Sequence, residues 1–321
     1  MAIHGNEIKI FTGNANPQMA QAMADKLGVP LGKSDITKFA DGEISVNIGE
    51  TVRGADVFVV QPTCKPVNDH LMELLLMIDA FRRASADRIT AIIPYYGYAR
   101  QDRKIKARDP ISAKLVADLI TAAGTDRVLT MDLHTQQLQG FFNIPLDHLV
   151  GAPIIIEYFS QFFNESDKNR VTVVSPDLGS VARSRNFAER FNVPLAIIDK
   201  RRPCANQSEV VNIIGDVEGR NILIIDDIID TAGTLCNAAQ ALVEIGGAKN
   251  VYAAATHAVL SDPAIERISN SYLTGVVVMD TIPLTEKAAN CKKIKQLSAA
   301  PLFARAIRHI HEERAVSPLF V

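Results

Sequence analysis

The sequence predicts an α/β protein of two domains, each built on a mainly parallel sheet flanked by helices. Short apolar runs rich in β-branched residues alternate with helical patterns along the chain, which is the rhythm of parallel strands joined by crossover helices. This series of runs restarts around residues 151–153. A chain of 321 residues that is 47% hydrophobic is long enough to bury two cores of ordinary size.

Four strands are expected in the first half of the chain. They are the apolar runs Ile8–Thr12, Asp56–Val60, Ile89–Pro94 and Val128–Asp132. Between the first two, the segment 33–51 carries Asp41-Gly42 within alternating polar and apolar residues, which is typical of a β-hairpin inserted into the domain.

Two helices connect the later strands of this half. The first is indicated by four apolar residues at the i, i+3, i+4, i+7 spacing of one helical face: Leu71, Leu74, Leu75 and Ile78. Either Asn68 or Asp69 can cap its start. The second helix covers Ser112–Ala123 and ends at Gly124.

The second half repeats the pattern with five expected strands. They are Val171–Val174, Leu195–Ile198, Ile222–Ile225, Val251–Thr256 and Gly275–Met279. We therefore place one domain at residues 1–149 and a second at 150–300. A C-terminal helix and tail at 301–321 can pack back on the first domain.

Composition excludes several classes of protein. A net charge of -2 does not favour a nucleic acid or an anionic membrane as partner. No apolar run reaches the length of about 18 residues that spans a bilayer. The four cysteines, Cys64, Cys204, Cys236 and Cys291, form no C-x-x-C pair, which favours a reducing compartment. We expect a cytoplasmic protein.

The most informative segment runs from Asn221 to Thr234. An apolar strand ends in Asp226 and Asp227, and a tight turn, Asp230-Thr-Ala-Gly-Thr234, opens the next helix. Backbone N–H groups and the positive end of a helix dipole can bind phosphate there, with the hydroxyls of Thr231 and Thr234 as further donors. Paired carboxylates suit vicinal sugar hydroxyls. Together these groups indicate a site for a ribose phosphate.

This fingerprint resembles the phosphoribosyl-binding loop of type I phosphoribosyltransferases and of ribose-phosphate pyrophosphokinases. The resemblance implies two phosphoribosyltransferase-like domains, and it assigns ribose 5-phosphate to the segment Asp226, Asp227, Asp230, Thr231, Ala232, Gly233 and Thr234. Three further segments are similar to the pyrophosphokinases and separate them from the transferases.

The first such segment is Arg100-Gln101-Asp102, which follows the strand that ends near Pro94. In the family this triplet and a hairpin segment contact ATP, which implies nucleotide-binding roles for Arg100, Gln101, Asp102, Phe39, Asp41 and Glu43. An aromatic face can stack on a base, and arginine pairs with phosphate. Without the flanking motifs, the basic stretch 100–108 would be typical of a solvated loop.

The second segment places His134 at a strand end and Asp177 in Ser175-Pro-Asp-Leu-Gly179. In the family the matching side chains surround Mg²⁺ and its nucleotide. Magnesium prefers oxygen ligands and keeps its water, so direct binding by Asp177 is the simpler expectation and His134 can act through a water.

The third segment, Asp199–Pro203, resembles the catalytic flexible loop of the family and implies catalytic roles for Lys200, Arg202 and His134. A basic triplet alone usually indicates a solvated surface. In pyrophosphoryl transfer, a closing loop with Lys and Arg stabilises charge on the transferring group.

We therefore expect a magnesium-dependent ribose-phosphate diphosphokinase that supplies phosphoribosyl pyrophosphate for nucleotide, histidine and tryptophan biosynthesis. The alternatives are a transferase that consumes phosphoribosyl pyrophosphate, and a silent regulatory subunit. The resemblance also implies a homo-oligomer, commonly a hexamer, with the site in the cleft between the domains. Phosphate and ADP are expected as effectors at a site that includes Arg53, Ser85, Arg108, Gln139 and Ser317.

Overall fold

The chain divides into two compact units in the computed structural model, which describes residues 7–164, 167, 170–201 and 210–320. The first unit ends at Val150 and also contains Thr281–Pro283 and the C-terminal segment from Ser298. The second unit comprises Gly151–Asp280 and Leu284–Leu297. The two units are described separately below.

The first unit is built on a five-stranded parallel sheet with the order β1-β4-β5-β6-β7. Its strands are β1 (Ile8–Thr12), β4 (Asp56–Val60), β5 (Arg88–Ile93), β6 (Arg127–Met131) and β7 (Leu146–Leu149). The carboxyl ends of all five strands therefore meet at one edge, where open α/β sheets bind ligands. The four strands expected from the apolar runs are all present.

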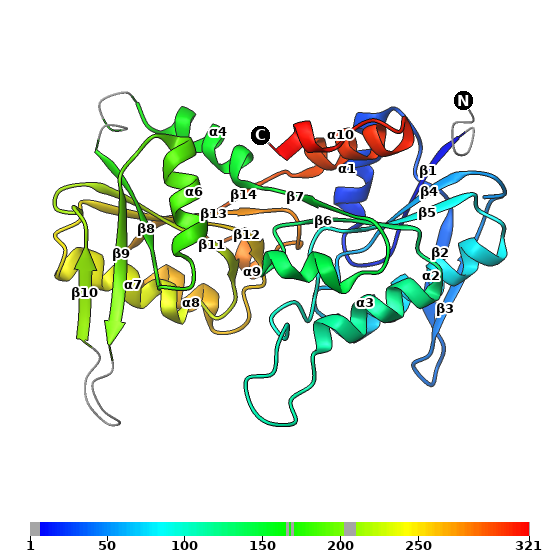
Figure 1. Ribbon diagram of the computed structural model, residues 1–321, viewed down its shortest axis with the longest axis horizontal. Coiled ribbons are helices and arrows are strands. Elements are labelled where there is room, and N and C mark those ends of the chain that lie inside the picture. The colour runs from blue at the N-terminus through cyan, green and yellow to red at the C-terminus, as the bar shows by residue number, and fades with distance from the viewer. Residues whose placement is uncertain (1–6, 165–166, 168–169, 202–209, 321) are drawn as a thin grey trace. The chain divides into compact units, whose positions relative to one another are not determined.

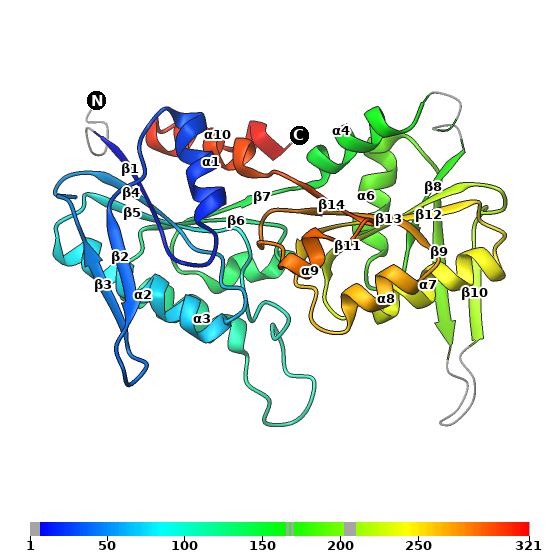
Figure 2. The same cartoon turned by 180° about the vertical axis from the view of Figure 1, so that it is seen from behind.

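Helices cover both faces of this sheet (Figure 1, Figure 2). They are α1 (Pro17–Leu27) and α10 (Ala300–His311) on one face, and α2 (Val67–Arg83) and α3 (Ser112–Ala123) on the other. Short 3-10 turns occupy Gln136–Phe141 and Ser317–Phe320. The predicted cap of α2 was wrong, because the helix already begins at Val67 and Pro66 holds the cap position without a side-chain hydrogen bond.

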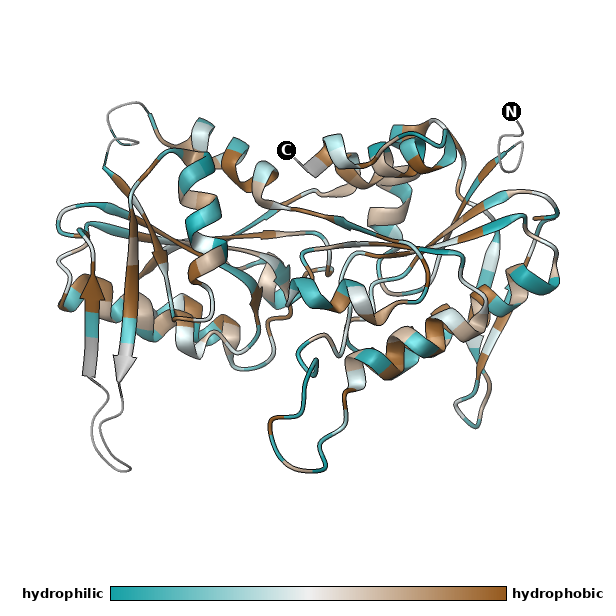
Figure 3. Cartoon of the chain, viewed as in Figure 1, coloured by the Kyte–Doolittle hydropathy of each residue, from teal (hydrophilic) through white to brown (hydrophobic). Residues whose placement is uncertain are grey.

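The core of the first unit is the apolar face of α2 packed on the sheet. Leu74 and Ile78 are fully buried, and Phe81 lies against Phe11 with ring centroids 4.7 Å apart. Each such side chain contributes about 1.5–3 kcal/mol through burial. Strand β4 is buried along its whole length, and many strands carry the hydrophobic colour in Figure 3.

The predicted hairpin is present as β2 (Ser34–Lys38) and β3 (Ile44–Ile48), which pair antiparallel. Gly42 turns the chain with a φ of 94°, a conformation that favours glycine. Near the base, the Asn14 side chain donates to the Ile36 carbonyl at 3.2 Å.

The C-terminal helix is fastened to the first unit by a polar cluster at the amino-terminal edge of the sheet. Asp56 is fully buried and accepts two hydrogen bonds from Arg88, at 2.9 and 2.5 Å. Arg88 also donates to the Ile310 carbonyl, and Nδ1 of His311 lies 2.8 Å from an Asp56 oxygen. The end of α10 is thus bound to β4 and β5.

The second unit holds a seven-stranded sheet with the order β10-β9-β8-β11-β12-β13-β14. The strands are β8 (Val171–Ser175), β9 (Leu195–Arg201), β10 (Val210–Ile214), β11 (Asn221–Ile229), β12 (Asn250–Ala258), β13 (Leu273–Met279) and β14 (Ile294–Leu297). All neighbours are parallel except β10, which runs antiparallel to β9.

Helices also cover both faces of the second sheet (Figure 1, Figure 2). They are α4 (Ala152–Phe162) and α6 (Val181–Phe191) on one face, and α7 (Gly233–Glu244) and α8 (Ala264–Asn270) on the other, with the short α9 (Glu286–Ala289) before β14. No helix among residues 7–164, 167, 170–201 and 210–320 is long and apolar enough to cross a membrane.

Strands β9 and β11 extend furthest beyond the carboxyl ends that the sequence indicates. The expected end of β11 was Ile225, but the strand stays paired with β12 as far as Ile229, while its other neighbour, β8, stops opposite Ile224. Likewise β9 continues through Arg201 because it pairs with β10. Sheet pairing overrides the low strand preference of the charged residues at both ends.

Candidate active site

A carboxylate pair and one arginine form the centre of the predicted ribose phosphate site. Asp226 and Asp227 lie on the part of β11 that extends beyond β8. Arg183 of α6 donates to Oδ1 of Asp227 at 2.6 Å and to Oδ1 of Asp226 at 3.2 Å. The Asp227 side chain is 4% exposed, whereas those of Asp226 and Arg183 are each 33% exposed. Asp226 is therefore the more accessible of the two carboxylates to a ligand.

The surroundings of Asp226 favour its protonated form. Desolvation, the neighbouring charge of Asp227 and a side-chain hydrogen bond with it together raise the pKa of this carboxyl to about 7, against the opposing effects of Arg183 and of the Asp227 N–H. The group can thus change its charge near neutral pH, and a hydroxyl donor or a cation bound there would favour the ionised form.

The turn that follows β11 offers unpaired backbone donors. Ala232 caps α7 in the left-handed conformation, with φ 57° and ψ 8°, which costs about 1–2 kcal/mol for a residue with a side chain. In the described part of the chain, the N–H groups of Ala232, Gly233 and Thr234 donate to no protein acceptor. Such N–H groups at the start of a twelve-residue helix can bind a phosphate.

The loop between β8 and α6 presents Asp177 in a tight turn. Its Oδ1 accepts the N–H of Ser180 at 2.9 Å, and its carbonyl accepts the Ser175 hydroxyl at 2.7 Å. Asp177 is half-buried, and Oδ2 takes part in no hydrogen bond found among the described residues. Oδ1 therefore stabilises the turn, while Oδ2 can bind a cation or a water.

In the first unit, the structure joins two of the predicted nucleotide-side segments. The hydroxyl of Thr135, next to His134, donates to Oδ2 of Asp102 at 2.9 Å. Gln101 is held by α3, because its carbonyl accepts the N–H of Ala113 at 3.2 Å and its side chain accepts the Ser112 hydroxyl. The segment from Arg100 to Asp102 and the His134 loop thus lie at the same carboxyl edge of the sheet.

At this edge of the sheet, Gly97 lies so close to the backbone of Thr63 that a side chain would not fit. A Cβ on Gly97 would lie 2.4 Å from the carbonyl oxygen of Thr63. The Gly97 N–H donates to the Thr63 hydroxyl at 2.6 Å. The loop that leads to Arg100 is therefore fixed against the end of β4.

The hairpin tip is exposed. Phe39, Asp41 and Glu43 all face solvent, with Phe39 59% exposed. The backbone of the tip is ordered by its own hydrogen bonds, from Phe39 N–H to the Glu43 carbonyl and from Glu43 N–H to Oδ1 of Asp41. Hydrogen bonds within the tip thus fix its backbone, whereas its side chains remain exposed to solvent.

The predicted catalytic pair is placed only in part. The backbone of Lys200 lies in β9, opposite Val211 of β10, and not in a loop as the sequence indicated. Arg202 lies outside the described residues. His134 is half-buried at the end of β6.

Among the predicted regulatory residues, the structure brings two together. The Gly54 N–H donates to the Ser85 carbonyl at 2.9 Å, which places Arg53 beside Ser85. Arg108, Gln139 and Ser317 are exposed on the first unit, and no hydrogen bond found among the described residues joins them to that pair.

The described residues fit a magnesium ion that arrives on a nucleotide. Among them, no group of three or more His, Cys, Asp or Glu side chains could hold a metal ion by itself. Magnesium commonly keeps several waters and binds through one or two carboxylates plus substrate phosphates. A single carboxylate such as Asp177, or the pair Asp226 and Asp227, is what this mode of binding requires.

Comparison with known proteins identifies the family. A model described as the N-terminal domain of ribose phosphate pyrophosphokinase matches residues 8–124, and one described as a phosphoribosyl synthetase-associated domain matches residues 202–321. A ribose-phosphate pyrophosphokinase of Clostridium perfringens is 61% identical over 320 residues, covering 100% of this chain and 99% of that protein. The chain belongs to the ribose-phosphate pyrophosphokinase family.

Other relatives agree with this assignment. The ribose-phosphate pyrophosphokinase of Bacillus subtilis is 53% identical over 313 residues, covering 98% of this chain and 97% of its own. A crystal structure of phosphoribosylpyrophosphate synthetase from Mycobacterium smegmatis matches with a TM-score of 0.89 at 43% identity, over 96% of this chain and 100% of that one. The predicted family and the predicted α/β fold class are confirmed.

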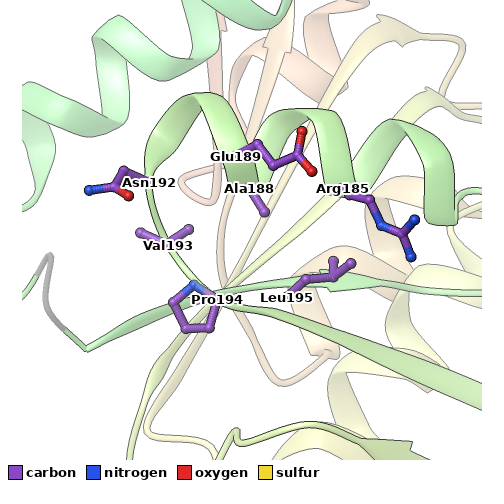
Figure 4. A pocket seen from close by; sticks show the side chains of 7 residues that line it. All are labelled: Arg185, Ala188, Glu189, Asn192, Val193, Pro194 and Leu195. Atoms are coloured by element: carbon purple, nitrogen blue, oxygen red, sulfur yellow. The ribbon is translucent and has the colours of Figure 1, made fainter.

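A pocket of about 540 Å³ lies elsewhere in this pyrophosphokinase fold (Figure 4). Ala188 of α6 and Leu195 at the start of β9 face each other across it, with Arg185 and Glu189 on the same helix. Because Leu195 is the first residue of its strand, this pocket lies at the amino-terminal edge of the sheet, away from the edge that binds ligands in such folds.

Two arginines near the site were missed by the sequence analysis. Arg183 stands in a helix 43 residues before Asp226, and Arg267 donates from α8 to the Thr231 carbonyl at 2.9 Å. Neither belongs to a motif used above. The one available indication was that Arg183 is the third residue of the helix that follows Asp177.

Proposed function

We propose that this chain transfers the pyrophosphoryl group of ATP, as its magnesium complex, to the 1-hydroxyl of ribose 5-phosphate. The observation that supports this most directly is the turn beyond β11, where N–H groups that donate to no acceptor among the described residues adjoin a carboxylate pair. The products are AMP and phosphoribosyl pyrophosphate. The names of the relatives support the same reaction.

The ribose side of the reaction falls to the second unit. The N–H groups of residues 232–234 and the hydroxyls of Thr231 and Thr234 bind the 5-phosphate. Asp226 and Asp227 accept from the vicinal ring hydroxyls, which leaves the 1-hydroxyl as nucleophile. Its oxygen forms a bond to the β-phosphorus, the bond to the α,β-bridging oxygen breaks, and AMP leaves with that oxygen while the hydroxyl proton is released.

The nucleotide side falls to Arg100, Gln101 and Asp102, with His134 on the adjoining loop. The exposed hairpin tip supplies Phe39, Asp41 and Glu43, which fits the predicted homo-hexamer, because such a tip can reach a nucleotide bound by a neighbouring subunit. Bound Mg²⁺ neutralises charge on the phosphate oxygens. Asp177 and His134 are the residues we assign to hold it, His134 through a water.

Lys200 and Arg202 stabilise the negative charge that develops on the transferring group. Phosphoryl transfer depends mainly on positioning and on electrostatic stabilisation, so cations over the transferring group accelerate it. Phosphate and ADP act as effectors through the set that contains Arg53, Ser85, Arg108, Gln139 and Ser317. If ADP inhibition stayed purely competitive with ATP at every phosphate concentration, this regulatory role would be wrong.

One assay separates the proposal from its rivals. Purified protein is mixed with ATP, ribose 5-phosphate and Mg²⁺, and AMP and phosphoribosyl pyrophosphate are measured. Equal amounts of both products are expected. A transferase that consumes phosphoribosyl pyrophosphate would form neither product from these substrates, and a silent regulatory subunit would leave the substrates unchanged.

In the same assay, Lys200→Ala is expected to lower kcat by about 100-fold or more, since a cation that contacts only the transition state is lost. The KM for ribose 5-phosphate should stay close to that of the wild-type protein. Near-normal turnover by this variant would remove Lys200 from its assigned role.

A further inference from the structure

Arg267 holds the predicted phosphate turn from its outer side. Its Nη1 donates to the carbonyl of Thr231 at 2.9 Å. The same nitrogen would lie 3.3 Å from a Cβ built on Gly233. The guanidinium therefore spans the turn between β11 and α7, although its own helix, α8, follows a different strand of the sheet.

The contact fixes the direction of one peptide group. In a planar trans peptide the C=O and the following N–H point in opposite directions. Because the Thr231 carbonyl points to Arg267, the N–H of Ala232 points to the opposite, inner side of the turn. This N–H is one of the three donors that find no protein acceptor in the described part of the chain.

The backbone of the turn would relax if this peptide reversed. Ala232 has a φ of 57°, in the left-handed region that side chains disfavour. A reversal of the peptide between Thr231 and Ala232 would bring this φ to a negative, ordinary value, and it would turn the Ala232 N–H away from the ligand. A bond to the Thr231 carbonyl opposes that reversal.

We propose that Arg267 is a positioning residue of the ribose 5-phosphate site, which keeps the Thr231–Ala232 peptide in the orientation that presents its N–H to the 5-phosphate. This inference rests on the proposed function of the turn. Arginine suits the task because a charged, planar guanidinium forms stronger hydrogen bonds to a carbonyl than a neutral donor does.

A merely structural role predicts a different result from a positioning role. Arg267 also lines a pocket of about 340 Å³ with residues of α7 such as Asn237, so its loss could simply loosen the packing of α7 on α8. Loosened packing would lower the melting temperature and would affect both substrates alike. Loss of positioning would weaken ribose 5-phosphate alone.

The test compares Arg267→Met and Arg267→Lys with Arg220→Met in the full-length protein. Arg220 is a matched control, because it lies just before β11 at the opposite end of the strand and pairs with Asp216. The KM values for both substrates and kcat are measured, together with ribose 5-phosphate binding by calorimetry without ATP.

Arg267→Met should raise the KM and the Kd for ribose 5-phosphate about tenfold, the usual scale for one charge-assisted hydrogen bond, while the KM for ATP stays within about twofold. Arg267→Lys should restore part of the affinity, because lysine can still donate to the carbonyl. Arg220→Met should match the wild-type protein. Equal changes in both KM values, or a ribose 5-phosphate Kd within about twofold of the wild-type value, would overturn the proposal.

A crystal structure of the Arg267→Met protein gives a readout independent of activity. A reversed Thr231–Ala232 peptide is expected, and an unchanged peptide would overturn the inference even if affinity fell. If the wild-type protein formed no phosphoribosyl pyrophosphate, the proposed reaction would fail, whereas the peptide orientation would still decide the role of Arg267 in the turn.

Discussion

The turn at residues 230–234, which we propose binds the 5-phosphate, and the hairpin tip at residues 39–43 differ in how many contacts the folded chain makes with them. Around the turn, Arg183 binds both carboxylates and Arg267 binds the backbone. At the tip, Phe39 is exposed and only the local backbone is hydrogen-bonded. The conformation of the turn is fixed by these contacts at some cost in stability, whereas the side chains at the tip are left exposed by the chain itself.

The two regions also differ in how much their conformations cost in folding stability. The turn keeps a carboxyl group partly desolvated and an alanine in the left-handed conformation, and both features oppose folding. The tip carries no comparable strain, since a positive φ occurs there only at Gly42 among its residues. Substitutions should therefore change pH dependence and stability at the turn, but affinity alone at the tip.

Among the three substitutions that test this comparison, the largest effect is expected from Arg183→Met. Arg183 lowers the pKa of Asp226, so without it that pKa rises further above its present value of about 7 and the carboxyl is more often protonated at neutral pH. The kcat/KM for ribose 5-phosphate should fall about tenfold at pH 7, and its rise with pH should move about one unit to the alkaline side. A pH series of kcat/KM measures both changes.

Arg185→Met is the matched control for this series. Arg185 stands two residues further along α6 and lines the separate pocket of Figure 4. The phosphate of the substrate also titrates, with a pKa of about 6, but it does so equally in every variant. If the pH profile of kcat/KM for Arg183→Met overlaid the profiles of Arg185→Met and the wild-type protein, Arg183 would not control the ionisation of Asp226.

Much of the fold was predictable because its strands are apolar and its helices have one apolar face. The prediction for α3, Ser112–Ala123, agrees with the structure at both ends, since a continuous apolar pattern runs up to a glycine that can take the left-handed conformation. The ends of β9 and β11 were not predictable, because Lys200 and Asp226 have low strand preference and stay extended only through pairing with a distant strand.

The sequence could indicate the candidate site where its residues are contiguous. Residues from Asp226 to Thr234 are consecutive, so their combined chemistry can be inferred from the sequence without knowledge of the fold. Arg183 and Arg267 could not be found in this way, since their contacts depend on how α6 and α8 cross opposite faces of the sheet. A basic residue on a helix has many possible neighbours until the topology is known.

An intermediate effect is expected at the tip. Phe39→Ala should raise the KM for ATP about 3- to 10-fold, the scale of one aromatic stacking contact, and leave the KM for ribose 5-phosphate unchanged. The melting temperature should not change, because replacing a side chain that is 59% exposed rarely alters stability. Steady-state kinetics and a thermal melt test the two statements.

Ile245→Ala controls for the loss of an exposed apolar side chain. Ile245 is 65% exposed at the end of α7 in the second unit. Its replacement by alanine should leave the KM for ATP unchanged. A destabilised Phe39→Ala protein would contradict the description of the tip as uncovered and unstrained, and the comparison with the turn would then fail.

The smallest effect is expected in the stability of an Asp226→Asn protein. The folded-state pKa of Asp226 is raised to about 7 from 3.8, so the folded chain binds the extra proton between these values and the wild-type stability falls as pH rises through that window. Asparagine cannot ionise, so the variant should melt a few degrees higher at pH 8, with a gain in melting temperature that shrinks as the pH is lowered towards 4.

Asp262→Asn, which removes an 88% exposed carboxylate, controls for the change in net charge. A gain that was equal at every pH, or a lower melting temperature at pH 8, would mean that the carboxylate pair does not oppose folding.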